Sequence, residues 1–317
     1  MDNTKYLKSP LNYTGNKYRV FGQIEPFFPE HTGTFVDLFC GGATVGINVN
    51  ADKVIFIDKN NRVISLLKFL ATENFDSLLK ALLKKVHEYN LSCSYESKYS
   101  SFYNAARPRN KNNGLKAFNN KGFTKLKNDY NKLSDKDSKE ANLLLYLLLV
   151  YGFNNDLRFN SFGEYNLPCG KTDLNKNNVE KIKRFNEKAN KSNFVFVSGD
   201  FRDKKIQKAI MNADFLYADP PYLITDAVYN ECSGWSIEDE NELISFLKLC
   251  NKNSLPFVLS NVLSKDNNNI INKPLDDFIK SEKTLRVVDI DYHYRSSSYN
   301  KKNRDANEKE IIVVSGK

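Results

Sequence analysis

The chain has 317 residues, enough for one large domain or two modest ones, each with its own core. Hydrophobic residues make up 41% and aromatic residues 13%, which excludes a largely disordered chain. The longest apolar run, residues 143–150, is too short to cross a bilayer, and we expect no secretory signal at the N-terminus. Five scattered cysteines lack metal-ligand spacing, so we expect a reduced cytoplasmic protein with no metal and no membrane partner.

Positive charge is concentrated between residues 97 and 133. The net charge of the chain is +9, and this stretch holds nine Lys or Arg residues against one acid, Asp129. Six aromatic residues are interleaved with them. Such a stretch is typical of a solvated basic face or of a surface that binds a polyanion such as nucleic acid, and alone it favours neither.

The first elements along the chain indicate an α/β sheet. The segment "TFVDLF" predicts a buried strand, followed by a tight glycine turn and, from residue 43, by the start of a helix. Residues 53–60 predict a second strand that carries Asp58 near its end and leads into another helix. This pattern is the beginning of a doubly wound sheet.

A helical and basic region then interrupts the sheet. Residues 72–150 show no strand alternation and close with a buried helix, and residues 157–171 alternate like a β-hairpin with Gly163 near its turn. Strand patterns return at 193–201, 214–222, 255–261, 285–294 and 309–316. We therefore expect a discontinuous catalytic domain, 1–70 and 173–317, and an inserted recognition domain, 71–172.

Two motifs carry candidate chemistry near strand ends. Asp58 is placed to accept both hydroxyls of a ribose, while Tyr13 and Lys17 suit the carboxylate end of an amino-acid-bearing nucleoside. An ordinary surface lysine would also explain Lys17. The segment "ADPPYL", 218–223, ends a strand on a rigid turn, because proline lacks the amide donor that a ladder needs.

Six segments in this order resemble the Dam-type (D12 class) DNA adenine-N6 methyltransferases. They are "LNYTGNK", "FVDLFCGGATVG", "VIFID", "YGFNNDLRFNSFGEYNLPCG", "VSGDF" and "ADPPY". The resemblance implies a Rossmann-like S-adenosylmethionine-dependent methyltransferase fold with an inserted helical DNA-recognition domain and a β-hairpin. It also implies that methyl is transferred from S-adenosylmethionine to adenine N6 in double-stranded DNA.

The resemblance implies one group of residues for each part of the cofactor. Tyr13 and Lys17 would contact the methionine, Asp58 the ribose, Asp200 and Phe201 the adenine, with Asp37, Phe39 and Gly41 in the turn beneath and Asp219 at the junction with the target base.

The same resemblance implies a catalytic role for Asp219, Pro220, Pro221 and Tyr222. The amine of adenine is a poor nucleophile because its lone pair is delocalised into the ring. Asp219 and the carbonyl of Pro220 can each accept one N6–H, which aims the lone pair at the methyl group. Tyr222 offers a face on which a flipped base can stack, worth about 1–3 kcal/mol.

The hairpin is the segment that would read DNA. Arg158 would contact a guanine next to the target adenine, worth about 1–3 kcal/mol of discrimination, unless it forms a salt bridge with Glu164. Phe153 and Asn154 would fill the space left by the flipped base, and Pro168 would contact the recognition site.

Other positions leave the full recognition site open. Asn12 replaces the lysine that GATC-specific enzymes usually have there, and Asp156 stands at a position that is often apolar. We expect GATC first and a longer or asymmetric GAT-containing site second. Arg295 lies in a segment that would either hold phosphates or form a disordered polar loop.

The expected biological role is modification within a restriction–modification system, with a cognate restriction endonuclease encoded nearby as a partner. An RNA adenine-N6 methyltransferase is one alternative. A non-catalytic DNA-binding protein that keeps a relic cofactor fold is the other, but it leaves "DPPY", Asp58 and Lys17 unexplained together.

Overall fold

The chain folds into two compact units in the computed structural model. The structure describes residues 5–13, 15–106, 113–224, 234–265, 269–291 and 308–316. The first unit comprises residues 1–16, 41–48 and 60–196, and the second comprises residues 17–40, 49–59 and 197–317. Within the described ranges, no helix is long and apolar enough to cross a membrane.

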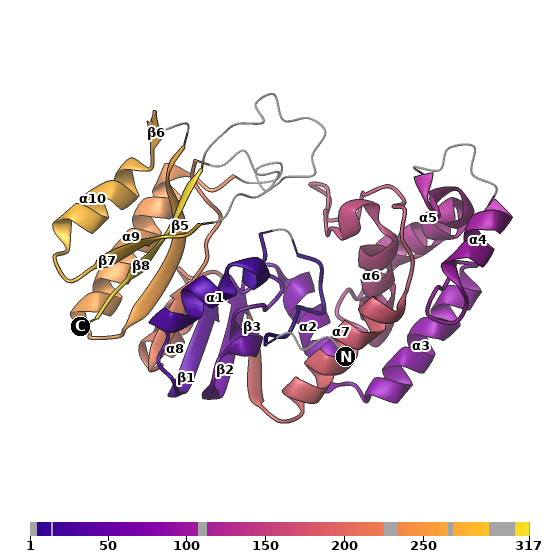
Figure 1. Cartoon of the computed structure of the whole chain (residues 1–317), viewed down its shortest axis with the longest axis horizontal. Helices are drawn as coiled ribbons and strands as arrows, with labels where there is room; N and C mark the ends of the chain where they lie inside the picture. The colour runs from indigo at the N-terminus through magenta and orange to yellow at the C-terminus, as the bar shows by residue number, and fades with distance from the viewer. Residues whose placement is uncertain are drawn as a thin grey trace. The chain divides into compact units, whose positions relative to one another are not determined.

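A mostly parallel sheet organises the fold (Figure 1). Its strands are β1 (Thr32–Leu38), β2 (Ala51–Asp58), β3 (Asn193–Ser198), β4 (Phe215–Ala218), β5 (Phe257–Lys265), β6 (Ile270–Ile271), β7 (Arg286–Asp289) and β8 (Lys309–Val314). Their order is β3-β2-β1-β4-β5-β8-β7, with β6 beside β5. The pairs β1–β2, β1–β4 and β4–β5 are parallel, whereas β8 runs antiparallel to both β5 and β7.

This topology places the carboxyl ends of β1, β2 and β4 at one edge of the sheet. The order of the strands reverses between β1 and β4, and ligands of open α/β sheets bind at such a point. The strands are apolar on both faces, as expected for parallel strands that are covered on both sides. The predicted Rossmann-like α/β methyltransferase fold is confirmed.

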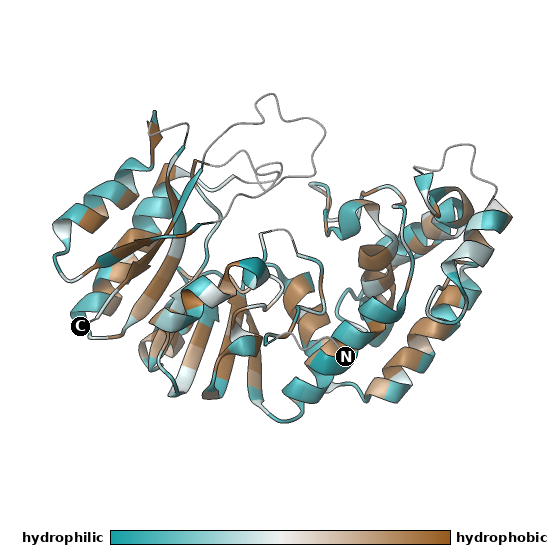
Figure 2. Cartoon of the chain, viewed as in Figure 1, coloured by the Kyte–Doolittle hydropathy of each residue, from teal (hydrophilic) through white to brown (hydrophobic). Residues whose placement is uncertain are grey.

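The helices between residues 61 and 151 lie in regions that were predicted to be helical, and the remaining helices were not predicted. The second unit contains α1 (Phe21–Ile24), α8 (Lys204–Met211), α9 (Ile237–Lys252) and α10 (Lys273–Ser281). The first unit contains α2 (Asn61–Thr72), α3 (Phe75–Glu88), α4 (Tyr99–Ala106), α5 (Lys116–Lys132), α6 (Lys139–Tyr151) and α7 (Lys176–Ala189). The predicted buried helix is α6, which Figure 2 shows as an almost continuously hydrophobic ribbon.

Aromatic packing forms part of the core of the second unit. The ring of Phe28 meets those of Phe35, Phe215 and Tyr217 edge-on, with centroids 5.3, 5.7 and 5.6 Å away. Phe35 of β1 also stacks on Phe215 of β4 at 5.5 Å. Such pairs add about 0.5–1.5 kcal/mol each to the area that they bury, so they tie β1 firmly to β4.

The helix predicted from residue 43 was wrong. The chain forms turns there and then only a short 3-10 helix, Gly46–Asn48. Ala43 has a φ of 62°, in the left-handed region that interrupts an α-helix. The amide of Asn48 donates to the carbonyls of Thr44 and Leu7, so side-chain contacts replace helical hydrogen bonds.

The domain boundaries stay a prediction. The region expected to be helical does form α3 to α6, and the expected hairpin has an antiparallel bridge between Phe159 and Tyr165. Gly163 lies in its turn with a φ of 74°. The division into catalytic and recognition domains concerns roles, which the two compact units leave untested.

The C-terminus of α2 depends on one buried amide, which yields a first prediction. The side chain of Asn186 on α7 donates to the carbonyls of Leu70, Ala71 and Glu73. Asn186→Ala leaves these acceptors without their donor, and we expect the free energy of unfolding to fall by about 2–4 kcal/mol. Urea denaturation measures this change. The matched control Asn177→Ala, at an exposed position of the same helix, should stay within about 0.5 kcal/mol of wild type; equal stability of both variants would contradict the prediction.

Candidate active site

A small pocket lies beside the carboxyl ends of β1 and β2 in the second unit. An aromatic trio lines it, Phe39, Phe201 and Trp235, together with Asp58 and Asp200. The remaining lining residues are Leu38, Ile57, Lys59, Gly199 and Arg202. An apolar slot edged by carboxylates suits a flat aromatic group that is joined to a part with hydroxyl groups.

The three rings of the trio contact one another. The centroid of Phe39 lies 5.6 Å from those of both Phe201 and Trp235, and the latter two are 6.0 Å apart. Phe39 has a φ of 62°, a conformation that costs a non-glycine residue about 1–2 kcal/mol. The ring contacts offset this strain, so Phe39 is held in place by its neighbours.

Trp235 was not among the predicted site residues. Its indole Nε1 donates to the carboxylate of Glu240 at 2.6 Å, and Asn261 and Asn272 donate to the other oxygen at 2.9 and 2.8 Å. Burial raises the pKa of Glu240. The signal in the sequence is a lone tryptophan directly before Ser236, which caps α9.

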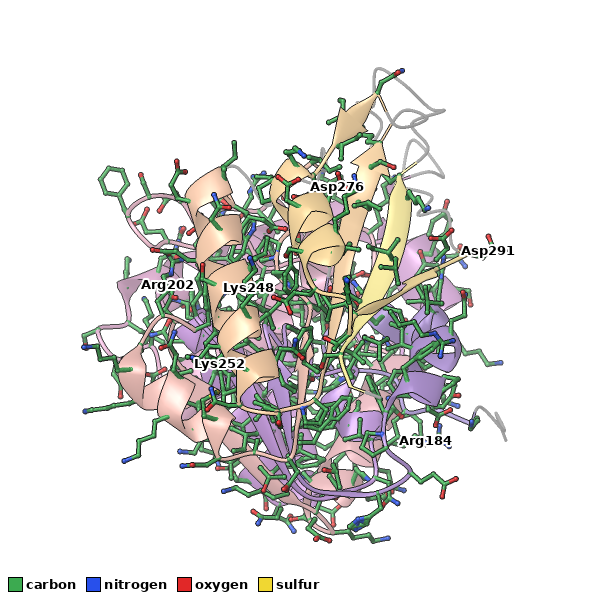
Figure 3. The ribbon with its side chains drawn as sticks, turned by 90° about the vertical axis from the view of Figure 1, so that its left-hand side faces the viewer. Arg184, Arg202, Lys248, Lys252, Asp276 and Asp291 are labelled. Carbon is green, nitrogen blue, oxygen red and sulfur yellow. The ribbon has the colours of Figure 1, made fainter. Side chains whose placement is uncertain are left out.

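The predicted adenine-binding acid is tied to an arginine. Asp200 Oδ1 accepts from the backbone amide and from Nε of Arg202 at 3.0 and 2.8 Å. The guanidinium of Arg202 also pairs with Asp239 and Glu242 of α9, at 2.8 and 3.1 Å. Figure 3 shows Arg202 beside this helix, which carries Lys248. The loop after β3 is thereby fixed, which makes Arg202 a second residue that the sequence did not reveal.

The "DPPY" turn carries a buried cluster of charges in the second unit. Lys17 is only 3% exposed, and its Nζ lies 2.8 Å from Asp219 Oδ1 and 3.6 Å from Glu310 Oε1. The hydroxyl of Tyr222 lies 3.1 Å from Asp219 Oδ1 and 3.0 Å from Glu310 Oε1. Lys17 Nζ also lies 5.1 Å from the centroid of the Tyr222 ring. The alternative of an ordinary surface lysine is therefore wrong.

Burial dominates the titration of Asp219. It raises the pKa of this carboxyl, and the nearby charge of Glu310 raises it further, whereas Lys17 and the hydroxyl of Tyr222 lower it. Beneath the turn, the hydroxyl of Tyr217 on β4 contacts that of Ser260 at 2.8 Å. The net direction is upward, so Asp219 holds its proton to a higher pH than an exposed aspartate does.

The predicted residues of the glycine turn are close-packed. Asp37, buried near the end of β1, is in register with Phe56 of β2 and Tyr217 of β4. Within the first unit, the ring of Tyr13 covers Gly41, where an added Cβ would lie 2.7 Å from Tyr13 Cε1. Gly41 has a φ of 48°, so both its conformation and this contact require glycine.

The hairpin is anchored to the first unit through Tyr165. Its hydroxyl donates to the carbonyl of Leu148 on α6 at 3.0 Å, and Asn131 of α5 bonds both its backbone groups. Arg158 Nε donates to Asn166 Oδ1 across the hairpin at 2.9 Å. The carboxylate of Glu164 instead accepts from the amide of Asn160 at 3.1 Å.

The other predicted DNA-contacting residues surround this hairpin. Phe153 is 44% exposed, and its backbone amide donates to the carbonyl of the exposed Pro168 at 2.9 Å. Asn154 is exposed and has a φ of 57°. The carboxylate of Asp156 accepts from the next backbone amide at 2.8 Å, so it fixes the turn locally.

Asn12 meets a lysine that the sequence did not associate with it. Its Oδ1 accepts from Nζ of Lys181 on α7 at 2.7 Å. Burial lowers the pKa of Lys181, and the charge of Lys8 lowers it further. Arg295 lies outside the described residues.

Similarity to known proteins agrees with this geometry. Residues 13–288 match the model of the D12 class N6 adenine-specific DNA methyltransferase family. The chain is 32% identical over 310 residues to modification methylase StsI of Streptococcus sanguinis, and 33% over 303 residues to the type II methyltransferase M.FokI of Planomicrobium okeanokoites. These alignments cover 96% and 93% of this chain but only 42% and 41% of the relatives.

A shorter relative is matched along most of its length. The DNA adenine methylase of Serratia marcescens is 25% identical over 256 residues, which are 79% of this chain and 82% of that protein. The family match covers both the aromatic pocket and the "DPPY" turn. The chain belongs to the D12 class of N6 adenine-specific DNA methyltransferases.

Proposed function

We propose that this chain transfers a methyl group from S-adenosylmethionine to N6 of adenine in double-stranded DNA. The observation that carries the proposal is the arrangement around Asp219, whose Oδ1 contacts both Lys17 and Tyr222. A carboxylate oxygen has two lone pairs, so two donors saturate it. We therefore assign the amine of the target base to Oδ2 and to the carbonyl of Pro220.

The residues that line the pocket have the chemistry to bind the nucleoside half of the cofactor. The rings of the aromatic trio touch one another in this structure, so we propose that they part and pack against the adenine, while Asp58 at the end of β2 accepts the ribose hydroxyls. When bound, S-adenosylmethionine supplies an activated methyl group on its sulfonium. Tyr13 and Lys17 are the residues proposed for its amino-acid end. Asp37, near the end of β1, and Gly41, in the turn that follows, are proposed to lie beneath that end.

The residues of the "DPPY" turn act by orientation and electrostatics. Asp219 and the Pro220 carbonyl hold the amine with its lone pair towards the methyl group, and Pro221 stiffens the turn. Positive charge grows on N6 as the bond to carbon forms, and the carboxylate stabilises it. N6 then loses one proton to Oδ2 of Asp219, the carboxylate oxygen proposed to accept its hydrogen bond.

We infer the biological setting from the names of the relatives and the kind of substrate from the hairpin. StsI is named as a modification methylase and M.FokI as a type II methyltransferase, which supports a role in a restriction–modification system with a cognate endonuclease and a cytoplasmic location. For the sequence, we keep GATC first and a longer GAT-containing site second. The fixed hairpin with Arg158 favours duplex DNA over RNA as the substrate, because base edges are readable in the major groove of DNA.

The lone tryptophan provides a direct test of the cofactor pocket. Because Trp235 is the chain's one tryptophan and lines the pocket, S-adenosylmethionine should change its fluorescence in a saturable way. Asp58→Ala removes the ribose acceptor and should raise Kd about tenfold or more, since hydrogen bonds to charged groups contribute about 1.5–3 kcal/mol. Asp52→Ala, an exposed acid of the same strand, is the control. Unchanged fluorescence of the wild type at millimolar cofactor would count against the pocket.

Substitution of the catalytic acid tests the reaction. Asp219→Ala should lower methyl transfer by about 10²- to 10³-fold or more while much of the DNA binding remains. Modified-base sequencing of DNA from cells that express each variant measures transfer and reveals the motif. N6-methyladenine at wild-type levels in the variant would refute the assigned role.

Substitution of the hairpin arginine tests sequence readout. Arg158→Ala should relax the base preference next to the target adenine, with a loss of about 1–3 kcal/mol of discrimination and a smaller loss of non-specific binding. Competition between duplexes that differ at one base pair measures the ratio. Arg184→Ala, at an arginine of α7 that pairs with Glu180, should leave the preference intact; an unchanged preference in Arg158→Ala would remove Arg158 from readout.

A further inference from the structure

Glu310 is the member of the buried cluster that neither the sequence nor the family match points to. It lies near the start of β8, beyond the matched residues 13–288, and is 4% exposed. A buried carboxylate costs several kcal/mol unless it is paired and hydrogen-bonded. Its partners are Lys17 and Tyr222, the two groups that also hold Asp219.

The geometry of the four side chains forms a closed ring of contacts. Lys17 Nζ and the Tyr222 hydroxyl each lie between Asp219 Oδ1 and Glu310 Oε1. A phenol has one proton, so Tyr222 can donate to only one of the two carboxylates at a time. The other contact relies on the ammonium of Lys17, so the two carboxylates compete for the same donors, and the charge of Glu310 raises the pKa of Asp219.

The net charge of the cluster suits the reaction. With both carboxylates ionised, one ammonium leaves the cluster one unit negative. A negative cluster beside the target amine stabilises the positive charge that develops on N6. Removal of Glu310 would let Lys17 neutralise Asp219 alone, and this stabilisation would be lost.

We infer that Glu310 is a positioning residue for methyl transfer, which orients Tyr222 and shares Lys17 with Asp219. The inference rests on the proposed function. Glu310 need not touch substrate or cofactor, because it acts through the hydroxyl of Tyr222 and the ammonium of Lys17. The groups around Asp219 are Lys17, Tyr222 and Glu310, with Tyr217 and Asp37 on the strands beneath.

The sign of the pH dependence follows from these charges. Glu310 raises the pKa of Asp219, and Lys17 lowers it. Glu310→Gln removes the negative charge that raises the pKa of Asp219. The ammonium of Lys17 then acts on Asp219 alone, so the pKa of Asp219 should fall. The acid limb of the rate profile should therefore move to lower pH, even though the plateau rate decreases.

The test is single-turnover methyl transfer from labelled S-adenosylmethionine to unmethylated plasmid DNA, measured as a function of pH. We expect Glu310→Gln to lower the plateau roughly 10- to 100-fold, the cost of a misplaced reacting group, and to shift the acid limb downward. Glu310→Asp keeps the charge and should restore the position of the limb. Asp289→Asn removes an exposed charge that pairs with the neighbouring Lys309, and it should change neither.

A double-mutant cycle separates positioning from a general loss of structure. In a Tyr222→Phe background, Glu310→Gln should cause a smaller further decrease, because the part of its effect that passes through the hydroxyl is already gone and only the part through Lys17 remains. A Glu310→Gln plateau within about twofold of wild type would overturn the inference. So would an unmoved acid limb together with additive effects, which a purely structural role predicts.

The same assay distinguishes the two levels of the argument. An active wild type with an unchanged Glu310→Gln variant refutes the role of Glu310 and leaves the proposed function standing. A wild type that methylates no adenine refutes the proposed function, and the inference falls with it.

Discussion

The burial of the Lys17 ammonium is the constraint on which the active-site half of the second unit depends. An ammonium that is withdrawn from water needs nearby charges or acceptors to compensate for its lost hydration. Asp219 in the turn after β4 and Glu310 on β8 provide them, and Tyr222 closes the contacts between the two carboxylates. The result joins the 3-10 helix at Lys17–Arg19, the turn after β4 and the start of β8.

A second fixed point lies at the neighbouring strand ends. The strained Phe39 is held by its edge-on contact with the ring of Trp235, and the indole of Trp235 is held by its hydrogen bond to Glu240. Arg202 fixes the loop after β3 through three acids. Because the three rings contact one another, they must separate before an adenine can enter, and the loss of these contacts is part of the cost of binding.

Local patterns were enough to predict most of the fold. The apolar runs of β1 and β2 and the leucine-rich α6 are fixed by composition and period alone. The helix predicted from Ala43 failed because the backbone is left-handed at Ala43, and the side chain of Asn48 hydrogen-bonds to Leu7, 41 positions away, outside any helix. Propensity does not contain such a contact.

The site shows the same division between local and long-range information. Asp58 and Asp219 follow strands directly, so their sequence neighbours identify them. Glu310 lies 88 positions from Tyr222 along the chain, and only the antiparallel return of β8 brings the two together. Trp235 likewise joins the pocket from a third segment, which a reading of consecutive residues cannot find.

The anchoring of the hairpin has a consequence for how specificity evolves. Asn131 and the carbonyl of Leu148 hold Tyr165, while Asn160 organises the turn by accepting from the amides of Phe162 and Glu164. The tip is therefore ordered mostly by its own hydrogen bonds, and Arg62 of α2 contacts it at the ring of Phe159. In the proposed role of the hairpin in readout, exchange of its tip would leave the helical framework folded, so that a segment of a few residues would be enough to change the recognition sequence.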